Sequence, residues 1–141
     1  MMPQLFALLT AMAWGIGGYF EKQGLHLGHL SPQMGITIRT AVAVVILGIV
    51  SFPDWKSIPT AGPGALLSLA IGGGIVAGSV GMLCFYAALK GAPLGQVMPI
   101  AFTSPLFSVL MAVLVGGEPV TAKGILGMLM TVGGIVLLTI G

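Results

Sequence analysis

The chain has 141 residues, the length of one domain, and 57% of them are hydrophobic while only 6% are charged. A soluble domain carries about 25% charged residues, so this chain could not cover its surface in water, and hydrocarbon is the solvent that fits its composition. The net charge is only +2, and the scattered basic residues form no footprint for nucleic acid. Cys84 is the only cysteine, which excludes an intrachain disulfide.

Five stretches are long and apolar enough to cross a bilayer as helices, which takes about 20 residues each. They predict an all-α integral membrane protein in which residues 1–141 form a single domain, a bundle of five transmembrane helices. The segments between them are too short for a soluble domain, so function has to lie in the helices or at their ends. The expected helices are roughly Gln4–Phe20, Gln33–Phe52, Gly64–Leu89, Pro93–Val115 and Ala122–Ile140.

The start of the first expected helix partly follows the pattern of a secretory signal. "LFALLT" followed by "AMA" resembles an apolar core with a small-residue cleavage site. No Lys or Arg precedes it, and the apolar pattern continues from Trp14 to Phe20. We therefore expect this segment to stay in place as the first membrane helix.

One face of the first helix carries small residues and a lysine at helical spacing: Ala11, Gly15, Gly18 and Lys22. Trp14 and Tyr19 flank this stripe. Aromatic rings near a polar opening can stack on organic or cationic solutes. For Tyr19 the alternative is the aromatic belt at the membrane surface, and for Trp14 it is packing between helices.

Arg39 interrupts the apolar second helix about 9 Å from its start at Gln33, at 1.5 Å per residue. An arginine at this depth can snorkel to the interface, and even a central one costs about 2.5–3.5 kcal/mol on insertion. A structural role and a role in a polar vestibule therefore both stay open. Gly35 and Ala43 share a stripe with Arg39, which favours placement against protein or a cavity.

The third helix contains two rows of small residues, Gly74 with Gly78 and Gly73 with Ala77 and Gly81. Such rows indicate close helix packing, within the chain or across a dimer interface, and they name no function.

The fourth helix contains Pro99 and Pro105, each of which removes a backbone donor and predicts a kink. Gln96 and Thr103 share one face, and the hydroxyls of Thr103 and Ser104 can bond the freed carbonyls. A cavity wall and an ordinary kinked membrane helix are both consistent with this pattern.

Reactive chemistry is poorly represented. We expect His26 and His29 in a loop and no zinc site, because zinc takes three or four ligands. Glu118 is expected to stabilise the start of the fifth helix. With no nucleophile–base set and no phosphate-binding loop, the sequence predicts neither an enzyme nor a cofactor. Glu21, at the end of the first helix, is the nearest candidate for a carboxylate in the membrane.

The Lys and Arg bias that sets membrane orientation is weak. Lys56 and Lys123 lie on the N-terminal side, while Lys22 and Lys90, with Arg39 nearby, lie on the other. Two interpretations stay open: a single orientation, and insertion both ways with antiparallel pairing, which would produce the inverted repeats common in alternating-access transporters.

The spacing of several motifs resembles the EamA-type proteins of the drug/metabolite transporter superfamily. In "WGIGGYFEK" a Trp-Gly pair is followed by a Lys eight residues after the Trp, and a Pro precedes an Arg by seven residues in the second helix. The residues that match the family pattern are Trp14, Gly15, Lys22, Pro32, Arg39, Ala88, Leu89, Pro105, Gly117, Glu118, Gly127 and Gly134.

The resemblance implies export or exchange of small organic metabolites through a cavity between two five-helix repeats. Most members carry both repeats, whereas this chain is similar to the single-repeat bacterial and archaeal branch. The chain lacks the mid-membrane glutamate that the small multidrug-resistance relatives carry in the first helix, so proton-coupled cation export by that route is not expected.

We therefore predict an exporter or exchanger of small organic solutes that works by alternating access as an antiparallel homodimer, in a prokaryotic cytoplasmic (inner) membrane. The alternative is an accessory subunit that pairs with another five-helix chain. The expected partners are the lipid bilayer, a small organic solute and a second copy, with no nucleic acid, cofactor or metal. Residues expected to line the cavity are Trp14, Gly15, Tyr19, Arg39, Gln96, Thr103 and Ser104. Residues expected at helix ends and kinks are Lys22, Pro99, Pro105 and Glu118.

Overall fold

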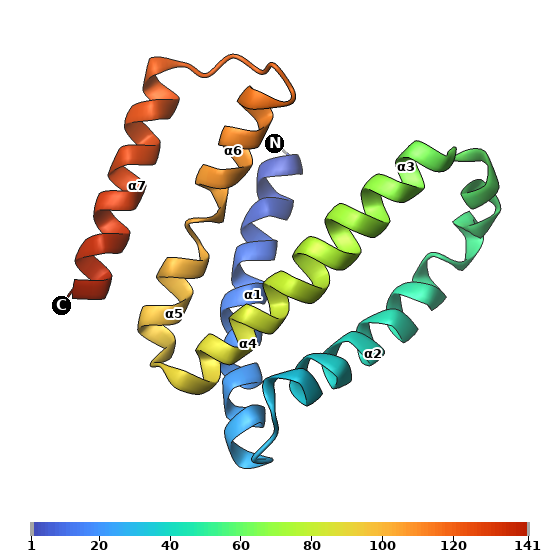
Figure 1. Cartoon of the computed structure of the whole chain (residues 1–141), viewed down its shortest axis with the longest axis horizontal. Helices are drawn as coiled ribbons and strands as arrows, with labels where there is room; N and C mark the ends of the chain where they lie inside the picture. The colour runs from blue at the N-terminus through green and yellow to red at the C-terminus, as the bar shows by residue number, and fades with distance from the viewer. Residues whose placement is uncertain (1, 141) are drawn as a thin grey trace. The chain divides into compact units, whose positions relative to one another are not determined.

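The computed structural model describes residues 2–140, apart from the side chain of Met2, and this part of the chain is built of helices without strands (Figure 1). The all-α prediction is confirmed there; Met1 and Gly141, the ends of the predicted domain, lie outside the described residues. The elements are α1 (Met2–Leu27), α2 (Pro32–Val50), the 3-10 helix η1 (Phe52–Thr60), α3 (Pro63–Ser68), the π-helix η2 (Leu69–Gly81), α4 (Met82–Gly91), α5 (Leu94–Ala101), α6 (Ser104–Leu114) and α7 (Ala122–Ile140).

Four stretches within residues 2–140 are long and apolar enough to cross a membrane: Pro32–Val50, Pro63–Gly91, Leu94–Leu114 and Ala122–Ile140. They coincide with the second to fifth predicted spans. The first predicted span, in α1, is not among them, because polar side chains such as Gln4 and Glu21 lower its mean hydropathy. A count of five crossing helices therefore stays a prediction.

Helix α1 continues well past the predicted end at Phe20, so the expectation that both histidines lie in a loop was wrong for His26. Its Nδ1–H donates to the Lys22 carbonyl oxygen within the helix at 2.9 Å. The helix then ends at a left-handed residue, His29, with φ of 48°. The Leu30 N–H bonds the Leu25 carbonyl at 3.1 Å and the His29 N–H bonds that of His26 at 3.3 Å, which is the Schellman pattern.

Most of the connection after α2 is the 3-10 helix η1. Pro53 stands in its first turn, where a missing N–H costs nothing, and the Asp54 N–H bonds the Ser51 carbonyl at 2.9 Å. Trp55 Nε1 donates to the Ser51 hydroxyl at 3.0 Å. These local bonds give the proline-rich segment a regular structure.

The chain forms two compact units. The central unit comprises Tyr19–Gly91, and the terminal unit comprises Met1–Gly18 together with Ala92–Gly141. Whether they act as the predicted single domain stays a prediction.

In the central unit, α2 packs against α4. The segments α3, η2 and α4 follow one another as one long helix. Figure 1 shows that α2 lies close to this helix at its α4 end and diverges from it toward η1. The buried apolar side chains of this unit lie at the meeting end: Leu25, Ile36, Tyr86 and Leu89. The end of α1, the start of α2 and α4 thus share one small core.

The π-helix η2 explains part of the small-residue pattern in the third span. A π-helix turns more widely than an α-helix and bonds each carbonyl to the fifth residue along. A Cβ added to Gly78 would lie 2.8 Å from the carbonyl oxygen of Gly73 in the same helix. At this position the helix's own backbone requires glycine, whereas the sequence suggested a neighbouring helix.

In the terminal unit, the fourth span is divided into α5 and α6, and α7 packs against α5. Helix α5 ends at Ala101 because Pro105, four residues on, has no N–H for that carbonyl and stands in the first turn of α6. The Thr103 N–H bonds the Ile100 carbonyl at 3.1 Å and bridges the break. Gly18 of α1 lies against α5, where an added Cβ would be 3.1 Å from Met98 Sδ.

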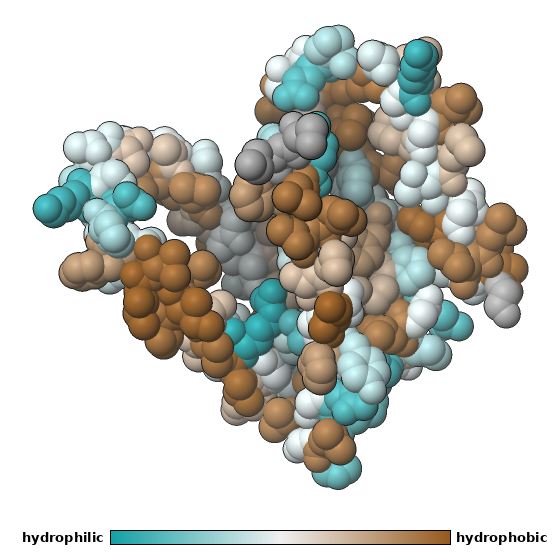
Figure 2. Space-filling view, turned by 180° about the vertical axis from the view of Figure 1, so that it is seen from behind, coloured by the Kyte–Doolittle hydropathy of each residue, from teal (hydrophilic) through white to brown (hydrophobic). Residues whose placement is uncertain are grey.

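Most large apolar side chains are exposed, and each of the four spans is at most 6% buried. Figure 2 shows one face, on which apolar side chains cover the helical segments and polar ones gather mainly at the connections. Water does not tolerate so much contiguous apolar surface, and a bilayer does.

Candidate functional site

The single arginine of the chain is ion-paired inside the central unit. Arg39 Nε lies 2.8 Å from Oε1 of Glu21, and the two side chains are 40% and 20% exposed. Glu21 belongs to the last part of α1 and Arg39 stands about 10 Å along α2 from Pro32. The Ser31 hydroxyl caps the start of α2 by accepting from the Met34 N–H at 3.2 Å. The short turn before it reverses the chain direction, so that the two charges meet.

Tyr86 of α4 completes the cluster. Its side chain is 2% exposed and lies within electrostatic range of both the Glu21 carboxylate and the Arg39 guanidinium. The ring leaves no room on α2, because a Cβ added to Gly35 would lie 2.5 Å from Leu25 Cδ2 and 3.0 Å from two ring atoms of Tyr86. Glycine at position 35 therefore lets α2 approach α4 closely enough to bring Arg39 to the pair.

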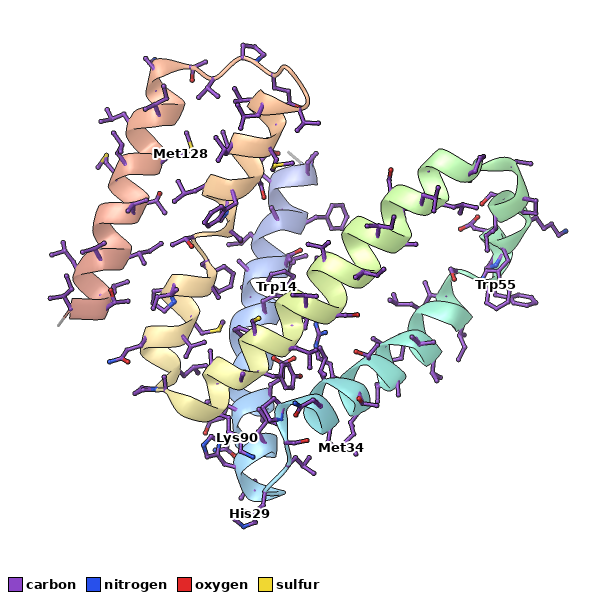
Figure 3. The ribbon with its side chains drawn as sticks, in the orientation of Figure 1. Trp14, His29, Met34, Trp55, Lys90 and Met128 are labelled. Atoms are coloured by element: carbon purple, nitrogen blue, oxygen red, sulfur yellow. The ribbon has the colours of Figure 1, made fainter. Side chains whose placement is uncertain are left out.

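Two lysines tie the same end of the central unit together. Lys22 Nζ donates to the Leu89 carbonyl at 2.9 Å, and Lys90 Nζ donates to the Leu30 carbonyl. Figure 3 shows Lys90 at the end of α4 near the α1–α2 turn that carries His29, with Trp55 at the opposite end of the unit. The charged side chains of this part of the central unit are Lys22, Lys90, Arg39 and Glu21, so the local net charge is positive.

Trp14 and Thr103 both lie near the break between α5 and α6 in the terminal unit. The Trp14 ring is 6.2 Å from the Phe102 ring between centroids, tilted by 35°, and it is 58% exposed. The Thr103 hydroxyl donates to the Ile100 carbonyl at 2.7 Å. An exposed indole therefore stands beside a region where helical bonding is interrupted.

The other residues expected in the cavity have fewer contacts. Gln96 and Ser104 are exposed in the terminal unit, where the Ser104 carbonyl accepts from the Ser108 hydroxyl at 3.1 Å. A Cβ on Gly15 would meet nothing within 4 Å. Tyr19, in the central unit, is exposed and its hydroxyl accepts from Gln23 Nε2 at 2.8 Å.

Among the residues expected at kinks and helix ends, Pro99 lies inside α5 and Pro105 opens α6. Glu118 lies in the loop before α7, with its N–H bonded to the Ala112 carbonyl at 3.1 Å. The start of α7 is capped by the Thr121 hydroxyl, which accepts from the Gly124 N–H at 3.1 Å. The first turn of α7 thus has a side-chain cap from Thr121, and stabilisation of this helix start by the charge of Glu118 stays a prediction.

The sequence interpretation missed Tyr86 and did not pair Glu21 with Arg39. Glu21 was recognisable as the one carboxylate of the first span, one short turn away from the one arginine. Tyr86 stands just before the Ala88-Leu89 pair, which served only as a family marker. Within residues 2–140 no three His, Cys, Asp or Glu side chains come together as a metal site.

These observations define a class: an integral, multi-pass α-helical membrane protein with a charged cluster between apolar helices. Within that class, the chain belongs to the EamA-like transporter family, whose pattern matches residues 1–140. The resemblance found in the sequence is confirmed, and the chain is a membrane transporter of the drug/metabolite type. No curated protein and no solved structure matches it.

Proposed function

We propose that the protein exports or exchanges small organic metabolites by alternating access, as an antiparallel homodimer in a prokaryotic cytoplasmic membrane. The observation that carries the proposal is the Glu21–Arg39 ion pair at 2.8 Å in a transporter-family chain whose long helices expose mostly apolar side chains. Ionisable groups between membrane helices are costly and mark solute or ion pathways.

The residues proposed to contact the solute are those that the sequence indicated: Trp14, Gly15, Tyr19, Arg39, Gln96, Thr103 and Ser104. Exposed Trp14 and Tyr19 offer flat faces for an organic solute, and Arg39 offers charge. The break between α5 and α6 adds backbone groups that are not bonded in a regular helix, a feature that transporters use at their binding sites. Lys22, Pro99, Pro105 and Glu118 serve helix ends and kinks in this proposal.

The homodimer follows from the exposed apolar surface and the balanced lysines. One five-helix repeat provides half of the inverted pair on which alternating access is built, and a second copy inserted the other way provides the other half. Lys56 and Lys123 against Lys22 and Lys90 leave little bias toward one orientation.

Transport is tested by solute counterflow in proteoliposomes made with the full chain. The panel comprises labelled alanine, phenylacetate, 2-phenylethylammonium and glucose. We expect at least one solute to accumulate above protein-free liposomes, and Trp14→Ala and Arg39→Gln to reduce that accumulation in protein that remains folded. Leu137→Ala, at an exposed position of α7, serves as the control. Counterflow equal to that of protein-free liposomes for the whole panel contradicts transport by this chain.

Orientation is tested separately with tags on both termini that are labelled from each side of the membrane. Dual insertion predicts that each tag is accessible from both sides. Labelling of each tag from one side only would remove the antiparallel homodimer and leave the transport proposal to the counterflow assay.

A further inference from the structure

We infer that the Arg39 guanidinium binds small organic carboxylates, and that the ligand carboxylate takes the place that Glu21 occupies in this structure. The inference deepens the proposed function and rests on it, because it names the class of solute that the transporter takes.

The Arg39 side chain has more hydrogen-bonding capacity than its ion pair with Glu21 uses. A guanidinium has more N–H donors than a single carboxylate can accept. Among residues 2–140, Glu21 is the only hydrogen-bonding partner of the Arg39 side chain, which remains 40% exposed. Between apolar helices the remaining donors need an acceptor other than lipid tails, and a carboxylate matches the planar fork of a guanidinium.

Glu21 has a second polar side chain nearby, which makes its release of Arg39 less costly. The buried Tyr86 side chain lies within electrostatic range of the Glu21 carboxylate. When a ligand carboxylate engages Arg39, the Tyr86 hydroxyl is a nearby group that can donate to Glu21, so the cost of an unpaired buried charge is reduced. Two carboxylates then compete for one cation, which is a simple basis for exchange.

The charges around Arg39 favour a negatively charged ligand. The Glu21 side chain is 20% exposed and the Arg39 side chain is 40% exposed, so a ligand reaches the guanidinium more easily than the carboxylate. Lys22 and Lys90 add positive charge at the same end of the central unit. A positive local field attracts an anion and repels an amine, so the site favours carboxylates over cationic solutes.

Because Arg39 is the only arginine, [15N]arginine labelling gives a single side-chain Nε signal that reports on this site alone. The labelled full chain in phosphatidylcholine nanodiscs is titrated with acetate, phenylacetate, 2-phenylethanol and 2-phenylethylammonium. The last three probes share one shape and differ in charge. Lipid phosphate is present in every sample, so it sets the reference signal.

We expect the Arg39 Nε signal to shift saturably with the carboxylates and not with the alcohol or the amine. Glu21→Gln removes the competing charge and should tighten the carboxylate titration about fivefold, the factor that corresponds to a modest ion pair. Lys56→Gln, which removes an exposed charge in η1, should leave the titration unchanged. No saturable shift with either carboxylate, or equal shifts with amine and carboxylate, would overturn the inference.

Counterflow separates this inference from the proposed function. The Glu21→Gln/Arg39→Gln double variant removes both charges together and leaves no unpaired partner, so it is the variant best placed to fold. Loss of phenylacetate counterflow in this variant supports the carboxylate assignment. If wild-type protein moves glucose or 2-phenylethylammonium while the Arg39 signal does not respond to carboxylates, the carboxylate assignment fails and the transport proposal stands. If Arg39 binds carboxylates and no solute of the panel is transported, the transport proposal fails and the carboxylate site at Arg39 is retained.

Discussion

Gly35→Ala tests whether close approach of α2 to α4 holds the charged cluster together. The added methyl group would lie 2.5 Å from Leu25 Cδ2 and 3.0 Å from two atoms of the Tyr86 ring, where ordinary contacts measure 3.4–4 Å. Leu25 and Tyr86 are each 2% exposed, so neither side chain has free space into which it can move. Overpacking of this kind costs about 1–3 kcal/mol.

The matched control is Gly24→Ala in α1 of the same unit, where an added Cβ meets nothing within 4 Å. Alanine favours a helix over glycine by about 1 kcal/mol, so the control should be as stable as wild type or more so. The difference between the two variants isolates the overpacking, which we expect to lower the free energy of unfolding of Gly35→Ala by about 1–3 kcal/mol relative to Gly24→Ala.

The assay is unfolding by sodium dodecyl sulfate in mixed micelles, followed by circular dichroism. The Nε signal of Arg39 adds a local measurement, because displacement of Tyr86 changes the environment of Glu21. We expect that signal to move in Gly35→Ala and to stay in place in Gly24→Ala. Equal unfolding midpoints and unchanged Arg39 signals in both variants would refute the packing described for the central unit.

Three further changes probe the fold with the same unfolding assay. Leu89→Ala empties a fully buried site and should cost about 2–5 kcal/mol, whereas Leu137→Ala, at a position 77% exposed, should cost far less; similar losses would contradict the burial of Leu89. Thr121→Ala removes the cap of α7 and should cost about 1 kcal/mol, with faster hydrogen exchange in the first turn; unchanged exchange there would argue against the cap. His29→Gly removes the strain of a non-glycine residue in the left-handed conformation and should raise the free energy of unfolding by about 1 kcal/mol; a lower free energy of unfolding would show that contacts of the histidine side chain outweigh this strain.

Much of the fold could be predicted from the lengths of the apolar runs alone. Long uninterrupted runs identify the second to fifth spans, and Ala122–Ile140 matches α7 at both ends. The ends of the helices were harder to predict, because they depend on hydrogen bonds within the turns that follow them. His26 is helical because α1 ends later, in a Schellman pattern with His29 in the left-handed conformation. Composition alone does not predict a non-glycine residue in that conformation.

The charged cluster was predictable only in part. A charge in an apolar run indicated that Arg39 needs a partner, but its partner is set by how the turn between α1 and α2 directs the two helices. Tyr86 could not be found by periodicity, since its burial depends on the space left by Gly35 on another helix. Pairings between helices are products of tertiary packing, whereas sequence patterns report mainly on single elements.

The most direct test of the central claim is the distance between Glu21 and Arg39 in a lipid bilayer. Solid-state NMR of chains labelled with [15N]arginine and [13C]glutamate can measure dipolar coupling between the arginine side chain and each glutamate carboxyl carbon. The 2.8 Å contact between Arg39 Nε and Glu21 Oε1 predicts strong coupling to one carboxyl signal, which disappears in Glu21→Gln, and none to Glu118. Absence of coupling to either glutamate in the bilayer would contradict the site on which the account rests.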